Sequence, residues 1–254
     1  MLPDSPSSAS DPSPAEPVYR LYSALSTTLP LDSQAGLGGK LLYAGDIERG
    51  RNLLYAANIA GAASLAASAD PTALRQAMRD GVVDFLVTSL EEALRILKNE
   101  IRKRQTVSVG VSADPYRVAE QMLERGVLPD LLPFDGTLDP AHAARFLGQG
   151  SRPILAPADS EAEFVSWSVD RDFARWLPRL DACALSILPP EDFIRKRWLR
   201  LAPRYLGRLA HRQHGVALTE AELMRFRAEV EQALAVSRSE DPPDVAIQAA
   251  DSPR

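Results

Sequence analysis

Residues 82–111, VVDFLVTSLEEALRILKNEIRKRQTVSVGV, contain the pattern that decides the fold. The two apolar runs at 82–87 and 107–111 are short and rich in valine, as expected for strands that are covered on both faces of a parallel sheet. Between them, Ser89 is a good helix N-cap, and Glu91 places negative charge in the first turn, where the helix dipole favours it. The stretch therefore predicts a strand, a crossover helix and a second, parallel strand.

Short apolar runs continue to alternate with amphipathic stretches on both sides of this unit. We expect further strands at 40–44, 62–67 and 130–132, and two more at 153–156 and 184–188. Strands that alternate with helices in this way are typical of an α/β fold. We predict a Rossmann-like parallel sheet with flanking helices.

Helical patterns become more frequent in the second half of the chain. Residues 161–177 have the pattern of one or two helices that Pro178 ends. A longer helical pattern covers 193–213, with Pro203 as a break or kink, and a last helix runs over 219–236 behind a capping sequence.

The composition divides the chain into four parts. Proline recurs with serine and aspartate in residues 1–17 and 238–254, and such segments bury too little apolar surface to offset the entropy of ordering. We therefore expect disordered tails at both termini. Between them we predict an α/β domain over 18–188 and a C-terminal helical appendage over 189–237.

Composition also excludes several classes of protein. The chain has 254 residues, of which 45% are hydrophobic and 25% charged, and it has no apolar run long enough for a transmembrane segment. Its single cysteine, Cys183, excludes an internal disulfide and suits a reducing compartment, and no secretion signal is evident, so we expect a cytoplasmic protein. The net charge of -5 makes nucleic acid an unlikely partner for the surface as a whole.

Several short stretches between residues 37 and 140 resemble one family at matching spacing. They are LGGK at 37–40, AG at 44–45, AGA at 60–62, SLEEAL at 89–94, VSVGV at 107–111 and ERGVLPD at 124–130. Together they resemble the central NAD-binding, Rossmann-like domain of urocanase (urocanate hydratase), the lyase that hydrates urocanate in histidine catabolism. The resemblance implies the same fold for this part of the chain.

The departures from the family pattern bear on function. The resemblance implies a glycine-rich run after the first strand that cradles the pyrophosphate of NAD, but here residues 45–53 read GDIERGRNL. Only Gly45 and Gly50 remain, and Asp46 and Glu48 add negative charge where the phosphates would lie. NAD binding is therefore expected to be weakened, and glycine at Ile47 and Glu48 is expected to improve it. The flanking urocanase segments that hold the substrate are not recognisable, so hydro-lyase activity would require a partner that supplies them.

The candidate cofactor-binding residues are Gly45, Gly50, Asn58, Asp135 and Asp139. The two glycines alternatively form only a strand-to-helix turn, and Asn58 alternatively lies in a helix that packs closely on the sheet. The two aspartates follow the expected strand at 130–132, at the edge where open α/β sheets bind ligands, but they also suit turn formation and helix capping.

No metal site is expected. His211 and His214 lie three residues apart on a helical pattern, but the only other histidine is His142 and no cysteine is near. Cys183 itself is predicted to be a small buried apolar residue rather than a nucleophile.

The segment 195–212 is the strongest local anomaly, because it holds seven basic residues and no acidic one. Its basic side chains could bind a phosphate-rich partner or membrane surface, pair with the acidic side of the same chain, or contact a second subunit; pairing within the protein or between subunits is preferred.

Two functions follow from the sequence. The first is a stand-alone urocanase-like domain that binds a nucleotide or small metabolite without complete hydratase machinery. The alternative is a non-catalytic interaction module that docks a partner chain through this basic helix. The partner would be a second copy of the chain, which gives a homo-oligomer, or another polypeptide.

Overall fold

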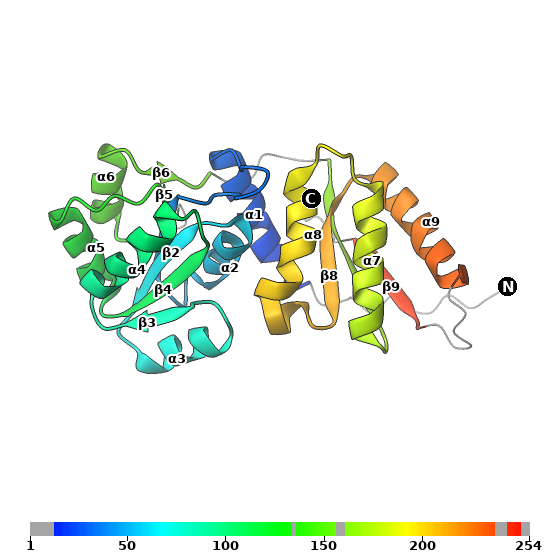
Figure 1. The fold of residues 1–254 in the computed structure, drawn as a ribbon, viewed down its shortest axis with the longest axis horizontal. Helices are drawn as coiled ribbons and strands as arrows, with labels where there is room; N and C mark the ends of the chain where they lie inside the picture. Colours follow the sequence, from blue (N-terminus) through cyan, green and yellow to red (C-terminus); the bar gives the residue numbers. More distant parts are fainter. Residues whose placement is uncertain (1–12, 134–135, 156–160, 237–242, 250–254) are drawn as a thin grey trace.

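The computed structural model describes residues 13–133, 136–155, 161–236 and 243–249, which form two sheets with helices around them (Figure 1). The larger sheet has six strands in the order β3-β4-β2-β1-β5-β6, and every adjacent pair is parallel. Its strands are β1 (Leu41–Asp46), β2 (Ala63–Ser68), β3 (Phe85–Val87), β4 (Val107–Ser112), β5 (Leu131–Leu132) and β6 (Arg152–Pro153). The predicted Rossmann-like parallel sheet is confirmed.

Helices cover both faces of this sheet. Helices α4, α5 and α6 pack on one face, around a core that contains Tyr43, Val109 and Phe146, and helices α1, α2 and α3 belong to the core of the other face. These helices are α1 (Glu16–Thr28), α2 (Arg51–Ala60), α3 (Pro71–Arg79), α4 (Leu90–Arg102), α5 (Pro115–Glu124) and α6 (Pro140–Gly148). Within the described ranges, no helix is both long and apolar enough to cross a membrane.

Strand β1 lies where the direction of strand addition reverses. From β1 the chain adds β2, β3 and β4 on one side, and it then returns to place β5 and β6 on the other side. In open α/β sheets this reversal leaves a crevice outside the carboxyl ends of the strands that flank it. The topology therefore directs attention to the loops that follow β1 and β5.

The second sheet is antiparallel and has three strands in the order β8-β7-β9. Figure 1 shows α7 and α8 side by side in front of it, with α9 beyond α7. The elements are β7 (Glu163–Val169), α7 (Phe173–Ile187), α8 (Phe193–Leu206), the 3-10 helix η1 (Gly207–Ala210), β8 (Gln213–Leu218), α9 (Glu220–Val236) and β9 (Val245–Ala249).

This sheet corrects two secondary-structure predictions. The helices predicted over 161–177 are instead strand β7 followed by the start of α7, and Pro178 lies inside α7 rather than at its end. The strand considered at 184–188 is the last turn of the same helix. In β7 the apolar residues alternate with serines, and this two-residue period is that of a strand.

The predictions for the C-terminal part hold only in part. Helices α8 and α9 lie in the predicted helical appendage at 189–237, but that region also contributes β8. Residues 245–249, assigned to the disordered tail 238–254, form β9, because their apolar side chains find a partner in β7. Helix α1 begins at Glu16, just inside the predicted tail 1–17. Residues 1–12, 238–242 and 250–254 of the predicted tails, and residue 237 of the predicted appendage, lie outside the described residues.

The run at 82–87 is also shorter as a strand than predicted. Only Phe85–Val87 form β3, and none of its residues is fully buried. Phe85 is 47% exposed to solvent. The reason is its place at the edge of the sheet, where it pairs with β4 alone. By contrast, β1, β2 and β4 are buried along almost their whole length, as the sequence predicts.

Helix α8 connects the two sheets through Trp198. The indole is 1% exposed, donates a hydrogen bond from Nε1 to the Gly215 carbonyl oxygen at 2.6 Å, and packs edge-on against Tyr19 at 4.9 Å between ring centroids. Tyr22 also lies against the indole and donates its hydroxyl hydrogen to the Ile194 carbonyl oxygen. The apolar face of the basic helix is thus part of the protein's own core.

Two arginines of α8 are used inside the protein. The Arg197 guanidinium donates to the Ile59 carbonyl oxygen at 2.9 Å, at the end of α2, and to the Gln34 carbonyl oxygen at 3.0 Å. Arg195 forms a forked ion pair with Glu222, at 2.6 and 2.8 Å, and its hydrogen bonds hold the pKa of that carboxyl below its usual value. Arg195 is thus paired with an acidic side chain of the same protein, as preferred, whereas Arg197 is held by backbone carbonyl oxygens.

We expect Trp198→Ala to lower the free energy of unfolding by about 3–5 kcal/mol, because it removes a fully buried indole between the two sheets. Phe193→Ala, at the exposed start of the same helix, is the control and should change it by less than about 1 kcal/mol. Chemical denaturation followed by circular dichroism gives both values. Equal effects of the two substitutions would show that α8 is not docked as described.

Candidate functional site

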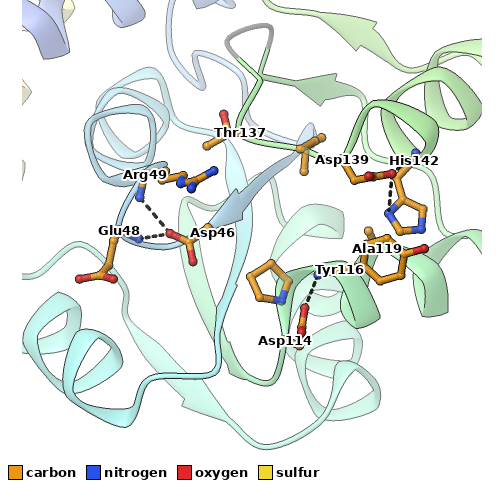
Figure 2. Close-up of a pocket in the computed structure, with 11 residues that line it drawn as sticks. Asp46, Glu48, Arg49, Asp114, Tyr116, Ala119, Thr137, Asp139 and His142 are labelled. Atoms are coloured by element: carbon orange, nitrogen blue, oxygen red, sulfur yellow. Dashed lines mark hydrogen bonds and ion pairs between the residues drawn. The ribbon is translucent and has the colours of Figure 1, made fainter.

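A cavity of about 450 Å³ opens at the carboxyl edge of the six-stranded sheet. Its walls come from three loops, which follow β1, β4 and β5, and from the first turns of α5 and α6 (Figure 2). The cavity thus lies at the reversal point that the strand order creates.

The loop after β1 is held by the carboxylate of Asp46. Its Oδ1 accepts hydrogen bonds from the backbone N–H groups of Glu48 and Arg49, both at 3.0 Å (Figure 2). The next amide, that of Gly50, donates to the Asp46 carbonyl oxygen at 2.8 Å, and the Ile47 amide donates to the Ala67 carbonyl oxygen at 2.9 Å. Every N–H from 47 to 50 therefore has an acceptor within the chain.

The two glycines of this loop allow close contact between backbone segments. Gly45 has a φ of +72°, and a Cβ there would lie 2.8 Å from Cδ2 of Leu138. Gly50 precedes α2, and its Cβ would lie 2.8 and 2.9 Å from the carbonyl oxygens of Ala44 and Asp46. Both glycines are needed for the turn itself, which is the alternative that the sequence left open.

Asp114 and Asp139 cap the helices whose first turns face the cavity. Oδ1 of Asp114 accepts from the N–H of Tyr116 at 2.8 Å, and Oδ1 of Asp139 accepts from the N–H groups of Ala141 and His142 at 3.1 and 3.2 Å. The capping role considered for Asp139 is therefore observed. The cap therefore already occupies the Tyr116 amide of α5 and the Ala141 and His142 amides of α6, which are not free to bind an anion.

Two aromatic side chains of the cavity were not anticipated as site residues. The His142 ring packs against Tyr116 with 4.3 Å between centroids and an interplanar angle of 54°. The His142 side chain is 5% exposed, whereas Tyr116 is 51% exposed. Nδ1 of His142 is buried, lies 3.7 Å from Oδ1 of Asp139, and has no hydrogen-bond partner among the described residues. Both residues lie in the first turn after an Asp-Pro pair, which is the only sequence signal that could have indicated them.

Negative charge predominates around the cavity. Among the described residues, four carboxylates line it, those of Asp46, Glu48, Asp114 and Asp139, against the one guanidinium of Arg49. Below them, the hydroxyl of Tyr43 donates to the Pro115 carbonyl oxygen at 2.8 Å. Burial, together with the charges of Asp114 and Asp46, raises the pKa of Tyr43.

The remaining candidate residues lie elsewhere. Asn58 is buried near the end of α2, away from the cavity, and donates its amide hydrogen to the Val82 carbonyl oxygen at 3.1 Å. Asp135 lies outside the described residues. The structure therefore brings Gly45, Gly50 and Asp139 to one edge and separates Asn58 from them.

The two histidines near the second sheet, His211 and His214, each contact another side chain. His214 Nδ1 contacts the Asp181 carboxylate at 2.8 Å, and His211 packs on the ring of Phe173. Cys183 is half-buried, and this burial raises the pKa of its thiol. Across the described segments, no group of three or more histidine, cysteine or acidic side chains is arranged to hold a metal ion.

The fold and the position of the cavity define the class: an open parallel α/β domain of the Rossmann type with a ligand-sized cavity at its reversal point. Comparison with protein families identifies the type more closely, because residues 35–143 match the model of the urocanase Rossmann-like domain. This segment is therefore similar to the urocanase Rossmann-like domain, and the resemblance seen over 37–140 is confirmed. The match ends inside α6, so β6 and the second sheet lie outside it.

We expect Gly45→Ala to lower the free energy of unfolding by about 2–3 kcal/mol, for two reasons. An alanine is strained in the left-handed backbone conformation at this position, and its methyl group would clash with Leu138. Gly126→Ala is the matched control, since Gly126 has a similar φ of +65° and no atom within 4 Å of the added methyl group. It should cost only about 1–2 kcal/mol. Leu138→Ala should cost less in the Gly45→Ala background than in the unmodified protein, because it relieves the contact with the added methyl group. Equal losses for the two glycine variants would contradict the packing at Gly45.

Proposed function

We propose that this domain binds a small ligand in the cavity at the carboxyl edge, and that its dinucleotide site is degenerate. In this proposal Gly45, Gly50 and Asp139 belong to the ligand site, NAD is held weakly or not at all, and the chain has no complete urocanate hydratase machinery. The observation that carries the proposal is the pair of hydrogen bonds from the Glu48 and Arg49 amides to the Asp46 carboxylate.

A pyrophosphate requires free backbone N–H groups at this loop. Here the carboxylate of Asp46 already serves as the anion that accepts those hydrogen bonds. A phosphate would have to displace it and would meet its charge at close range, which is unfavourable. Leu138, packed over Gly45, also occupies space next to the loop.

The extent of the family match supports a role without the complete reaction. It covers 35–143, and the second sheet and its helices lie outside it. Hydro-lyase activity would therefore depend on a partner chain that supplies the substrate-holding segments. The single cysteine, Cys183, favours a cytoplasmic location.

We expect the unmodified protein to retain no stoichiometric NAD, and Asp46→Gly with Glu48→Gly to raise its affinity for NAD about tenfold or more, because two loop amides are freed and two charges removed. Equilibrium dialysis with NAD measures this. Ile47 is not replaced by glycine, contrary to the sequence-based expectation, because its side chain is 1% exposed and belongs to the core.

Asp32→Gly is the control for this experiment. Asp32 makes the same type of turn as Asp46, accepting from the amides of Gln34 and Ala35 at 2.9 and 2.8 Å, but does not line the cavity. It should not change NAD affinity. Stoichiometric NAD in the unmodified protein would show that the site is not degenerate.

A second candidate function is docking of an acidic partner chain, or a second copy, through the outer face of α8. Four exposed arginines form no ion pair with any residue described: Arg200 and Arg204 on α8, Arg208 in η1, and Arg212 just after η1. Arg204 lies over the ring of Tyr205 and Arg212 over that of Phe173, contacts that hold both guanidinium groups near the surface. The proposal concerns only these outward arginines, since Arg195 and Arg197 are engaged inside.

We expect Arg200→Ala with Arg204→Ala to weaken association with the partner or second copy while the melting temperature stays within about 2 °C, because both side chains are exposed. Arg225→Ala with Arg227→Ala, on α9, makes the same change in net charge and is the control. Sedimentation velocity at low and physiological salt measures association. Loss of tight binding to nucleic acid or anionic vesicles in the α8 variant alone would assign this face to those surfaces instead.

A further inference from the structure

We infer that the ligand of the cavity is a small organic cation that carries an ammonium group. This inference rests on the proposed function, because it assigns the chemical class of the ligand to the same cavity. It concerns the charge, the free acceptor atoms and the aromatic rings that line it.

Three aspartates present acceptor capacity that the fold does not use. Asp46, Asp114 and Asp139 each bond backbone N–H groups through Oδ1 only, and no hydrogen bond from a described residue reaches the second oxygen, Oδ2. Figure 2 shows these three side chains around one opening. An ammonium group has three N–H donors and no acceptor, so it complements such a set of carboxylate oxygens.

The aromatic pair provides a second, independent indication. His142 is nine-tenths buried and lines the cavity, yet its Nδ1 has no hydrogen-bond partner in the described part of the chain. Its neighbour Tyr116, which is 51% exposed, also lines the cavity. An unbonded imidazole nitrogen is an acceptor for an N–H donor when the other nitrogen carries the proton, and an exposed aromatic face attracts an organic cation.

The same cavity is unfavourable for anions. The Tyr116 amide of α5 is bonded to Asp114, two amides of α6 are bonded to Asp139, and two amides of the loop after β1 are bonded to Asp46. Arg49 is the single cationic side chain that lines it. A carboxylate or phosphate ligand would face four negative charges for this one positive charge.

Three probes of equal chain length test the charge of the ligand: the diamine putrescine, the corresponding butanediol, and the dicarboxylate succinate. Isothermal titration calorimetry with the full chain at low salt should show putrescine binding at least about tenfold more tightly than the other two. The affinity should fall as salt is added, because the carboxylates are partly exposed.

Substitutions then locate the binding. Asp114→Asn and Asp139→Asn each remove a charge but keep a good N-cap, and each should weaken putrescine binding about fivefold. Asp70→Asn is the matched control, because Asp70 caps α3 before a proline in the same way but does not line the cavity. Arg49→Gln removes the one positive charge and should strengthen putrescine binding about threefold, a gain that a destabilised protein would not show.

The outcomes separate this inference from the proposed function. If butanediol or succinate binds as tightly as putrescine, the inference that the ligand is a cation is wrong, while the proposal that the cavity binds a small ligand stands. If putrescine fails to bind, or binds equally to the Asp114, Asp139 and Arg49 variants, the inference is overturned. Tight NAD binding by the unmodified protein would instead overturn the proposed function.

Discussion

Helix α2 is enclosed on every side, and this enclosure determines how the two sheets are joined. Residues 53–60 are all buried, between the parallel sheet, α1 and α8. A helix without an exposed face requires apolar or small residues all round, which the segment LLYAANIA supplies. Because α8 packs against both α2 and strand β8 of the second sheet, the two sheets share one apolar core. The loop after β1 leads directly into the start of α2, and the Arg197 guanidinium donates to a carbonyl oxygen near the end of α2. The loop and the contact between the two sheets are therefore attached to the same helix.

The character of the cavity follows from how its loops satisfy their own hydrogen bonds. A loop that leaves its N–H groups free binds anions, whereas one that carries its own carboxylate satisfies them internally and keeps a net negative charge. In this chain the loops that follow β1, β4 and β5 adopt the second arrangement, through Asp46, Asp114 and Asp139. The segment that matches the urocanase Rossmann-like domain thus combines a parallel α/β fold with carboxylates at the edge of its sheet.

The parts that could be predicted from sequence are those set by local patterns. Ser89 caps α4, and the stretch 82–111 indicated the parallel sheet correctly. The second sheet was missed because its strands depend on distant partners: Trp167 pairs with Ile247, and both were assigned to other structure. His142 and Tyr116 could not be connected from sequence, since their contact exists only where the loops after β4 and β5 meet. Asp139 was found because helix capping leaves a local signature.

The Asp-Pro caps of α3, α5 and α6 are alike in sequence, but their positions in the strand order place only two of them at the cavity. Asparagine, serine and threonine cap helices nearly as well as aspartate. Exchange among these residues at positions 114 and 139 would therefore alter the charge of the cavity at little expense to the fold. In evolutionary terms, ligand preference in such a domain can drift almost independently of stability, and relatives with the same backbone need not share a ligand.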